Sequence, residues 1–172
     1  MVSVSCPLAV LANLAVAKVN DYDPSSVDLP ALIECRSDVP TSNSFALWLS
    51  DQPNAPAKLG WKEARAGNLF LKQYELPAPL GVFGRETASI VFTTSGPMAM
   101  FEDVSAADLA QALGVTAPIS TPEKFLGEKV VIESSEQADR MTFATRIALN
   151  ISTVESHPGK TLAGCSYALD VK

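Results

Sequence analysis

The sequence is poor in charged residues and has no excess of basic ones. Charged side chains make up 19% of its 172 residues, whereas about 25% is usual in soluble domains. Lys and Arg number 13 against 19 Asp and Glu, which gives a formal net charge of -6. Because proteins that bind nucleic acids carry a basic patch that neutralises phosphates, this balance argues against a DNA- or RNA-binding function.

Histidine and cysteine are also scarce, which limits the chemistry. His157 is the only histidine, so a Ser–His or Cys–His catalytic pair, or a metal site with a histidine ligand, would have to include it. The three cysteines, Cys6, Cys35 and Cys165, form no CxxC motif. One pair could form in an oxidising compartment, but an odd number closes no disulfide framework, and we expect three reduced, buried thiols. We therefore predict no catalytic residue, no cofactor and no metal ligand.

No apolar run is long enough to cross a membrane. The longest, residues 6–17, is interrupted by Asn13 and is shorter than the roughly 18 to 20 residues that span a bilayer. Ala15-Val16-Ala17 matches the pattern of a signal-peptide cleavage site, but Lys18 is the first cation and lies after it. We therefore expect neither a transmembrane segment nor a secretory signal. The location stays open, with the cytoplasm or a virion favoured.

Apolar residues, in contrast, make up 47% of the chain, enough for a substantial core in a single domain, residues 1–172. The clearest pattern is a period of two over 141–154, with Phe143, Ile147 and Leu149 on one face, and a second such run over 161–171. This period marks strands with one buried face, and residues 155–159 between them have turn chemistry. The sequence therefore predicts a long antiparallel hairpin, 141–154 with 160–171, at the centre of the sheet and core.

Shorter patterns predict further elements. Ser105 is a good N-cap and Gly114 a good helix end, so a helix is predicted over 105–113. A second helix is predicted over 7–18, with a strand as the alternative. Strands are predicted at 45–50, 68–76, 88–94, 97–101 and 129–134, with a loop over 51–67 and with Pro77-Ala78-Pro79 ending the second strand. The sum is an α+β, β-rich fold: an antiparallel sheet, sandwich- or barrel-like, with one or two short helices.

The segment 107–115 resembles the first helix and turn of a helix-turn-helix DNA reader. A recognition helix would have to follow it, but Pro118 and Pro122 would break such a helix, and no cation appears before Lys124. We therefore interpret the segment as an amphipathic helix that packs on the sheet, and we do not expect DNA reading.

Aromatic residues cluster between positions 45 and 92, and this region supplies the candidate binding residues. Trp48, Trp61 and Tyr74 could stack on a sugar or a base, and Lys62 and Arg65 lie in the most basic part of the chain. Core packing would use the same rings and is the favoured interpretation. The carboxylates are scattered, and their spacing selects no acid–base pair.

These features together lead to a prediction about function. Few charges, a long hairpin and the lack of a catalytic constellation favour a non-enzymatic structural or interaction protein, a self-assembling subunit such as a virion coat or tail component. Its expected partner is a second copy of itself, contacted through the hairpin or the sheet face beside it. Two alternatives stay open: a small-molecule or glycan binding module that uses the aromatic cluster and, less favoured, a carboxylate-based enzyme.

Overall fold

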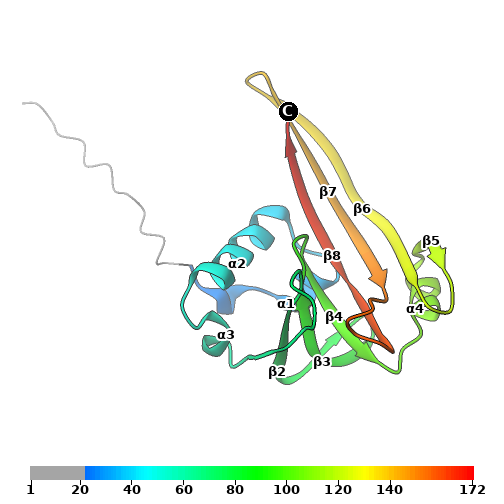
Figure 1. The fold of residues 1–172 in the computed structure, drawn as a ribbon. Coiled ribbons are helices and arrows are strands. Elements are labelled where there is room, and N and C mark those ends of the chain that lie inside the picture. Colours follow the sequence, from blue (N-terminus) through cyan, green and yellow to red (C-terminus); the bar gives the residue numbers. More distant parts are fainter. Residues whose placement is uncertain (1–21) are drawn as a thin grey trace, which may run out of the picture.

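The computed structural model describes residues 22–172, which form one antiparallel sheet of eight strands with four α-helices (Figure 1). The strands are β1 (Lys62–Ala64), β2 (Lys72–Val82), β3 (Arg85–Phe92), β4 (Pro97–Glu102), β5 (Thr116–Ser120), β6 (Phe125–Ala138), β7 (Met141–Ser152) and β8 (Lys160–Val171). The helices are the 3-10 turn η2 (Pro24–Ser26), α1 (Leu29–Ile33), α2 (Val39–Asp51), α3 (Ala55–Lys58) and α4 (Ala106–Leu113). The helix predicted over 7–18 and the thiol of Cys6 lie outside the described residues.

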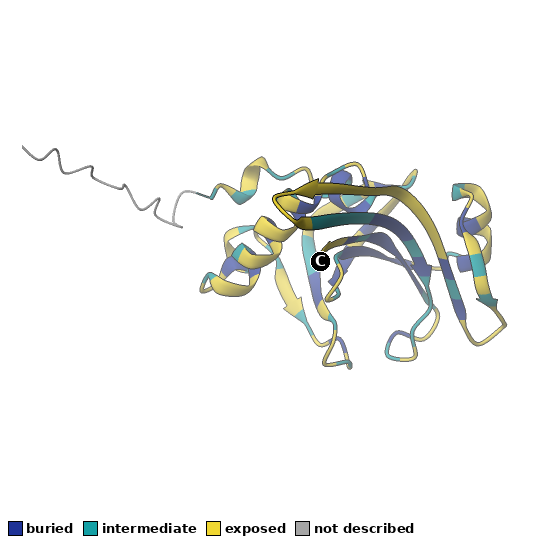
Figure 2. Cartoon of the chain, turned by 90° about the horizontal axis from the view of Figure 1, so that it is seen from above, coloured by how far each residue is buried: buried dark blue, intermediate teal, exposed yellow. Residues whose placement is uncertain are grey.

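The sheet is open and curved. Its strand order is β1-β2-β3-β4-β8-β7-β6-β5, and β1 and β5 at its two ends do not pair with each other. Figure 2 shows the strands following an arc. The prediction of a β-rich antiparallel fold is confirmed, but the sheet does not close into a barrel. Helices α1, α2 and α4 pack on one face of the sheet and form the main core with it. The large residues of this core include Leu32, Ile33, Phe45, Leu49, Ile90, Phe101, Leu109, Ile147, Leu149 and Ile151.

The predicted C-terminal hairpin is confirmed and lies inside the sheet. β7 and β8 form ten residue pairs, from Phe143 opposite Val171 to Ser152 opposite Leu162. On its other side, β8 pairs with β4. Gly164 lies where β4 comes closest, since a Cβ there would approach the Pro97 carbonyl oxygen to 2.2 Å. The close approach of these two backbones therefore requires glycine at this position of β8.

The two main helices show when capping signals decide the structure. α4 begins after Ser105, whose hydroxyl accepts a hydrogen bond from the Asp108 amide, and ends at Gly114 in the left-handed conformation, as predicted. The strand predicted at 45–50 is wrong, because these residues belong to α2. Asp38 caps α2 by accepting from the Thr41 amide at 2.7 Å. The buried residues of α2 lie three or four apart, at Val39, Ser42, Phe45 and Leu49, which is helical spacing.

The prolines of β2 do not end the strand where the sequence predicted. β2 pairs with β1 over 73–75 and with β3 over 72–75 and 80–82. The intervening residues 76–79, which include Pro77 and Pro79, lie at a break in register, so the missing proline amides leave no ladder hydrogen bond unmade. The loop predicted over 51–67 likewise contains α3 and β1.

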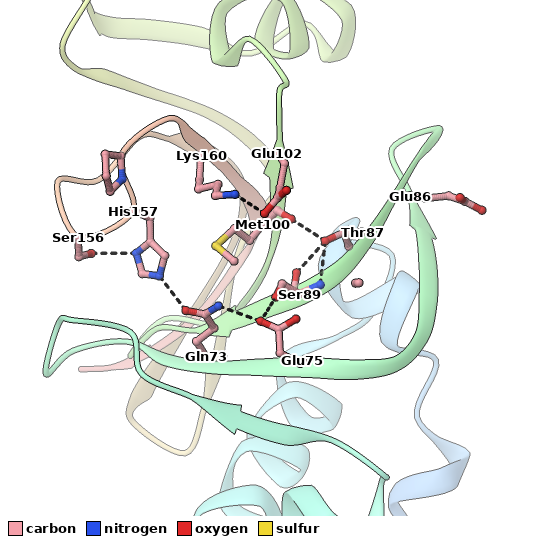
Figure 3. Close-up of a pocket in the computed structure, with 12 residues that line it drawn as sticks. Gln73, Glu75, Glu86, Thr87, Ser89, Met100, Glu102, Ser156, His157 and Lys160 are labelled. Carbon is pink, nitrogen blue, oxygen red and sulfur yellow. Dashed lines mark hydrogen bonds and ion pairs between the residues drawn. The ribbon is translucent and has the colours of Figure 1, made fainter.

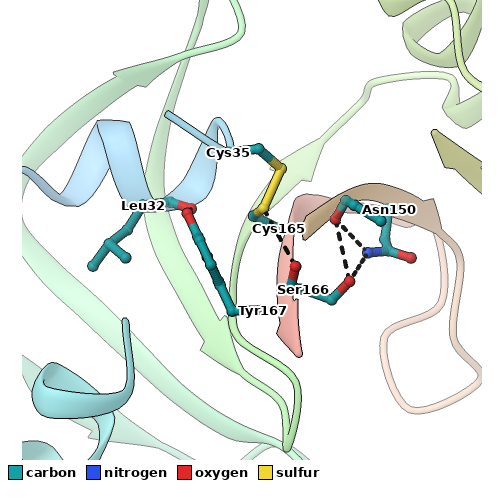
Figure 4. Close-up of a disulfide and its surroundings, with 7 residues drawn as sticks. Leu32, Cys35, Asn150, Cys165, Ser166 and Tyr167 are labelled. Atoms are coloured by element: carbon teal, nitrogen blue, oxygen red, sulfur yellow. Dashed lines mark hydrogen bonds between the residues drawn. A yellow bond between two sulfur atoms is a disulfide. The ribbon is translucent and has the colours of Figure 1, made fainter. Parts of the chain in front are cut away.

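The prediction of three reduced thiols is wrong, because Cys35 and Cys165 form a disulfide (Figure 4). It joins the end of α1 to the middle of β8, and both cysteines are buried. Nearby, the hydroxyl of Tyr167 on β8 donates to the Leu32 carbonyl at 2.8 Å, and burial raises the pKa of Tyr167 to about 12. A covalent bond and a buried hydrogen bond thus anchor α1 to the central strand. Disulfides of this kind persist in oxidising surroundings.

Candidate functional site

Of the three aromatic candidates, Tyr74 lies in the hydrophobic core, and Trp48 and Trp61 are partly buried against it. Tyr74 is 2% exposed, and its ring centroid lies 5.6 Å from that of Trp61. Trp48 stacks on Phe45 at 6.1 Å. Burial raises the pKa of Tyr74, with a smaller effect of Glu63 in the same direction. Trp48 and Trp61 both pack on Phe45, and Trp61 also packs on Tyr74, so the three rings contribute to core packing, which is the favoured interpretation of the sequence.

The two cationic candidates, Lys62 and Arg65, are exposed on β1 and just after it. The shallow cavity beside Arg65 is lined by residues 63–69, 71 and 72, and none of the three candidate rings contributes to it. The structure therefore does not combine the cations and the rings into one binding site. What lies next to the cations is instead the β1–β2 loop, residues 65–71, which presents two apolar side chains to solvent.

The apolar side chains of the β1–β2 loop are Leu69, 99% exposed, and Phe70, 77% exposed. The loop is an ordered turn, because the Asn68 side-chain oxygen accepts from the Phe70 amide at 2.9 Å and the Asn68 carbonyl accepts from the Leu71 amide at 3.2 Å. Sequence analysis missed this feature by placing residues 68–71 in a strand. The Gly67-Asn68 pair, which has turn chemistry, was the signal that could have revealed it.

A polar cavity of about 660 Å³ lies on the face of the sheet that the helices leave uncovered (Figure 3). A chain of hydrogen bonds crosses it: Ser156 to His157 at 2.9 Å, His157 to Gln73 at 3.0 Å and Gln73 to Glu75 at 3.1 Å. The Ser89 hydroxyl also donates to Glu75, at 2.5 Å. These hydrogen bonds connect the turn between β7 and β8 to β2 and β3, which are distant in sequence.

The carboxylate at one end of this chain determines where the histidine proton lies. Glu75 only accepts when ionised, so the Gln73 amide nitrogen faces it and the Gln73 oxygen faces His157. His157 Nε2 therefore carries the proton and donates, while Nδ1 accepts from the Ser156 hydroxyl. Burial lowers the pKa of His157, and the nearby Lys160 ammonium lowers it further. Both effects favour the neutral form of the ring.

The hydrogen bonds in the polar cavity are best explained as structural, because they hold the β7–β8 turn against β2. Both ring nitrogens of His157 are hydrogen-bonded, one to Ser156 and the other to Gln73. At the cavity rim, Lys160 forms an ion pair with Glu102. Among residues 22–172, no group of three or more His, Cys, Asp or Glu side chains is arranged to hold a metal ion.

The strongest candidate site is the region where three strands extend beyond the rest of the sheet (Figure 1). We call this region the arm; it consists of residues 129–138 of β6, 141–146 of β7 and 168–171 of β8. β5 pairs with β6 only over 125–128, and β4 pairs with β8 only as far as Gly164. Both outer edges of the arm therefore lack a partner strand among the described residues.

The two faces of the arm differ in polarity. Register places Phe143 opposite Val171, Thr145 opposite Leu169 and Ile147 opposite both Ile132 and Tyr167. Lower on this face Ile147 and Tyr167 are buried, but the helices end before the arm begins. Its apolar side chains are therefore half-exposed: Ile132 43%, Met141 47%, Leu169 47% and Val171 54%.

The opposite face of the arm is polar. It presents Glu133, Ser135, Gln137, Thr142, Ala144, Arg146, Ala168 and Asp170. At its base, Arg146 donates to both carboxylate oxygens of Glu128, at 3.0 and 2.5 Å. These hydrogen bonds lower the pKa of Glu128. One face of the arm thus resembles solvated protein surface, whereas the other carries most of the large apolar side chains of the arm, together with Ser134, Thr145 and Glu136.

Comparisons with known proteins give no match, whether with protein-family models, with curated proteins or with solved structures. Within residues 22–172, the helices are all too short or too polar to cross a membrane.

Proposed function

We propose that this chain is a non-enzymatic, self-assembling structural subunit, such as a virion coat or tail component, and that the arm joins its copies. The single observation that supports this most is that, within residues 22–172, the arm has two edges without a partner strand and a half-exposed apolar face. Contiguous apolar surface of this kind marks contact sites on soluble proteins, and unpaired strand edges are templates for pairing with another chain.

The free edge of β6 is the most favourable place for such pairing. Proteins usually protect edge strands with lysine, proline or bulges. The register shift between Val130 and Ile132 protects only the base of this edge. Residues 132–138 beyond it contain no lysine, and Lys129, which lies before it, donates to the Leu113 carbonyl at 3.0 Å. No proline occurs from 129 to 138. The sequence placed the contact on the 141–171 hairpin or the sheet face beside it, and the neighbouring strand β6 has an edge that no strand among residues 22–172 pairs beyond Glu128.

The apolar face alone supports only part of the affinity. Burying an aliphatic side chain fully stabilises by about 1.5 to 3 kcal/mol, so covering the exposed halves of four contributes about 3 to 6 kcal/mol. Association costs roughly 4 to 15 kcal/mol in lost freedom of motion. Backbone hydrogen bonds along the β6 edge, or a second contact elsewhere on the subunit, must therefore add to the apolar face.

Paired lysine substitutions on the arm test this proposal. Leu169→Lys places a charge on the apolar face, and Ala168→Lys places the same charge on the opposite face of the same strand, where Ala168 is exposed. We expect sedimentation velocity to show smaller species for Leu169→Lys than for Ala168→Lys or the unmodified chain, with equal thermal stability. Equal assembly of both variants would mean that this face is not the contact.

The alternative functions have less support from the geometry. A glycan-binding module would use the rings of Trp48, Trp61 and Tyr74, and these rings pack on their neighbours in the core. A carboxylate-based enzyme would require two acids facing a common cavity and free to act. In the polar cavity, Glu75 accepts from Ser89 and Gln73, Glu102 is paired with Lys160, and the side chain of Glu86 points away from both (Figure 3).

A further inference from the structure

The β1–β2 loop presents an apolar pair that the proposed assembly through the arm does not yet use. Single exposed apolar residues are common on protein surfaces, but Leu69 and Phe70 are adjacent, large and 99% and 77% exposed. The hydrogen bonds of Asn68 hold the turn that displays them. Because this exposure is unfavourable in water, the pair is suited to insertion into an apolar surface on another molecule.

The charges around the loop differ in sign from those on the edge of the arm. The segment 58–72 has four cations, Lys58, Lys62, Arg65 and Lys72, and one acid, Glu63, all exposed. On β6, Glu136 lies opposite Phe143 on the apolar face of the arm, whereas Glu133 lies opposite Arg146 on the polar face. The cations around the loop are therefore complementary in charge to Glu136, the acid that shares the apolar face.

Loop and arm also lie toward opposite ends of one sheet. β1 is the first strand in the order and β6 is the seventh, with β2, β3, β4, β8 and β7 between them. A contact between the loop of one copy and the arm of the next would leave the first copy's arm and the second copy's loop free. Such heterologous contacts continue from subunit to subunit and produce rings or extended arrays, not closed dimers.

We infer that the chain assembles head to tail, with Leu69 and Phe70 of one copy docked on the apolar face of the arm of the next. This inference rests on the proposed function and specifies its interface. The loop supplies the second contact surface that the modest apolar area of the arm requires, and Lys62 and Arg65 approach Glu136, which lies on the same face as Phe143.

The test uses one variant of each surface, alone and mixed. Phe70→Ser changes only the loop and Leu169→Lys only the arm; each alone raises the apparent Kd of assembly about tenfold or more, as for an apolar residue central to an interface. In an equimolar mixture, the intact arm of the first accepts the intact loop of the second. Sedimentation velocity then shows a heterodimer and nothing larger. Leu47→Ser, an exposed apolar residue of α2 outside both surfaces, is the matched control and assembles normally.

The outcomes separate the two proposals. If Phe70→Ser assembles as the unmodified chain does while Leu169→Lys does not, the arm is an interface but the head-to-tail arrangement is wrong. If the mixture of variants shows no heterodimer although each variant is defective alone, the loop does not dock on the arm. If the unmodified chain is monomeric, the proposed function itself is wrong.

Discussion

The disulfide between Cys35 and Cys165 is expected to supply a large part of the stability of the fold. It closes a sequence separation of 130 residues, for which the loop-closure entropy model gives about 5 kcal/mol at 25 °C. Small domains have a total unfolding free energy of roughly 5 to 15 kcal/mol. Replacing both cysteines by alanine should therefore lower the free energy of unfolding by several kcal/mol, and Tyr167 and Leu32 would still hold α1 on β8.

Urea denaturation, followed by tryptophan fluorescence with and without reductant, measures this effect. The unmodified chain should lose stability on reduction, whereas the double alanine variant, as the control, should not respond to reductant. Titration of the denatured, unreduced protein should leave the Cys35 and Cys165 thiols unreactive. If both react without reductant, or if the variant is as stable as the oxidised chain, the reasoning about this bond is refuted.

Two further predictions concern the core and the polar cavity. Ile147 is 2% exposed at the centre of β7, and replacing it by Ala should lower the free energy of unfolding by about 2 to 5 kcal/mol. A urea midpoint that barely moves would mean that this face of the hairpin is not core. Burial and Lys160 lower the pKa of His157 in the folded protein. As the pH falls, the histidine of the unfolded chain is therefore protonated at a higher pH than that of the folded chain. Stability should hold above about pH 6.5, the ordinary histidine value, and fall as the pH drops from there toward the lower folded pKa. Urea melts of the unmodified chain and of His157→Gln across this range check the effect, and parallel pH profiles would contradict it.

The parts of the fold that the sequence predicted are those with strong local signals. The alternation of β7 and β8 is long enough to exclude a helix, and Ser105 and Gly114 bracket α4 with capping chemistry. At 45–50 the local composition favoured a strand, but the cap at Asp38 and the buried face of Val39, Phe45 and Leu49 stabilise α2. Where a local pattern was ambiguous, packing against the sheet decided the structure.

Other features depend on contacts that no local pattern reports. The partner of Cys35 lies 130 residues away, so spacing gave no reason to pair it with Cys165. The Pro77 and Pro79 positions are tolerated in β2 because both neighbouring strands leave residues 76–79 unpaired. For the arm, the alternating apolar residues were visible in the sequence, but not that the helices would cover Ile147 and leave Leu169 and Val171 half-exposed.

The central claim is that this chain assembles with itself, and the most direct test is the molar mass of the unmodified, oxidised protein by sedimentation equilibrium. The account predicts a mass that rises with concentration in the micromolar range above the 18.2 kDa of one chain. A mass that stays at 18.2 kDa across that range at moderate salt would contradict it.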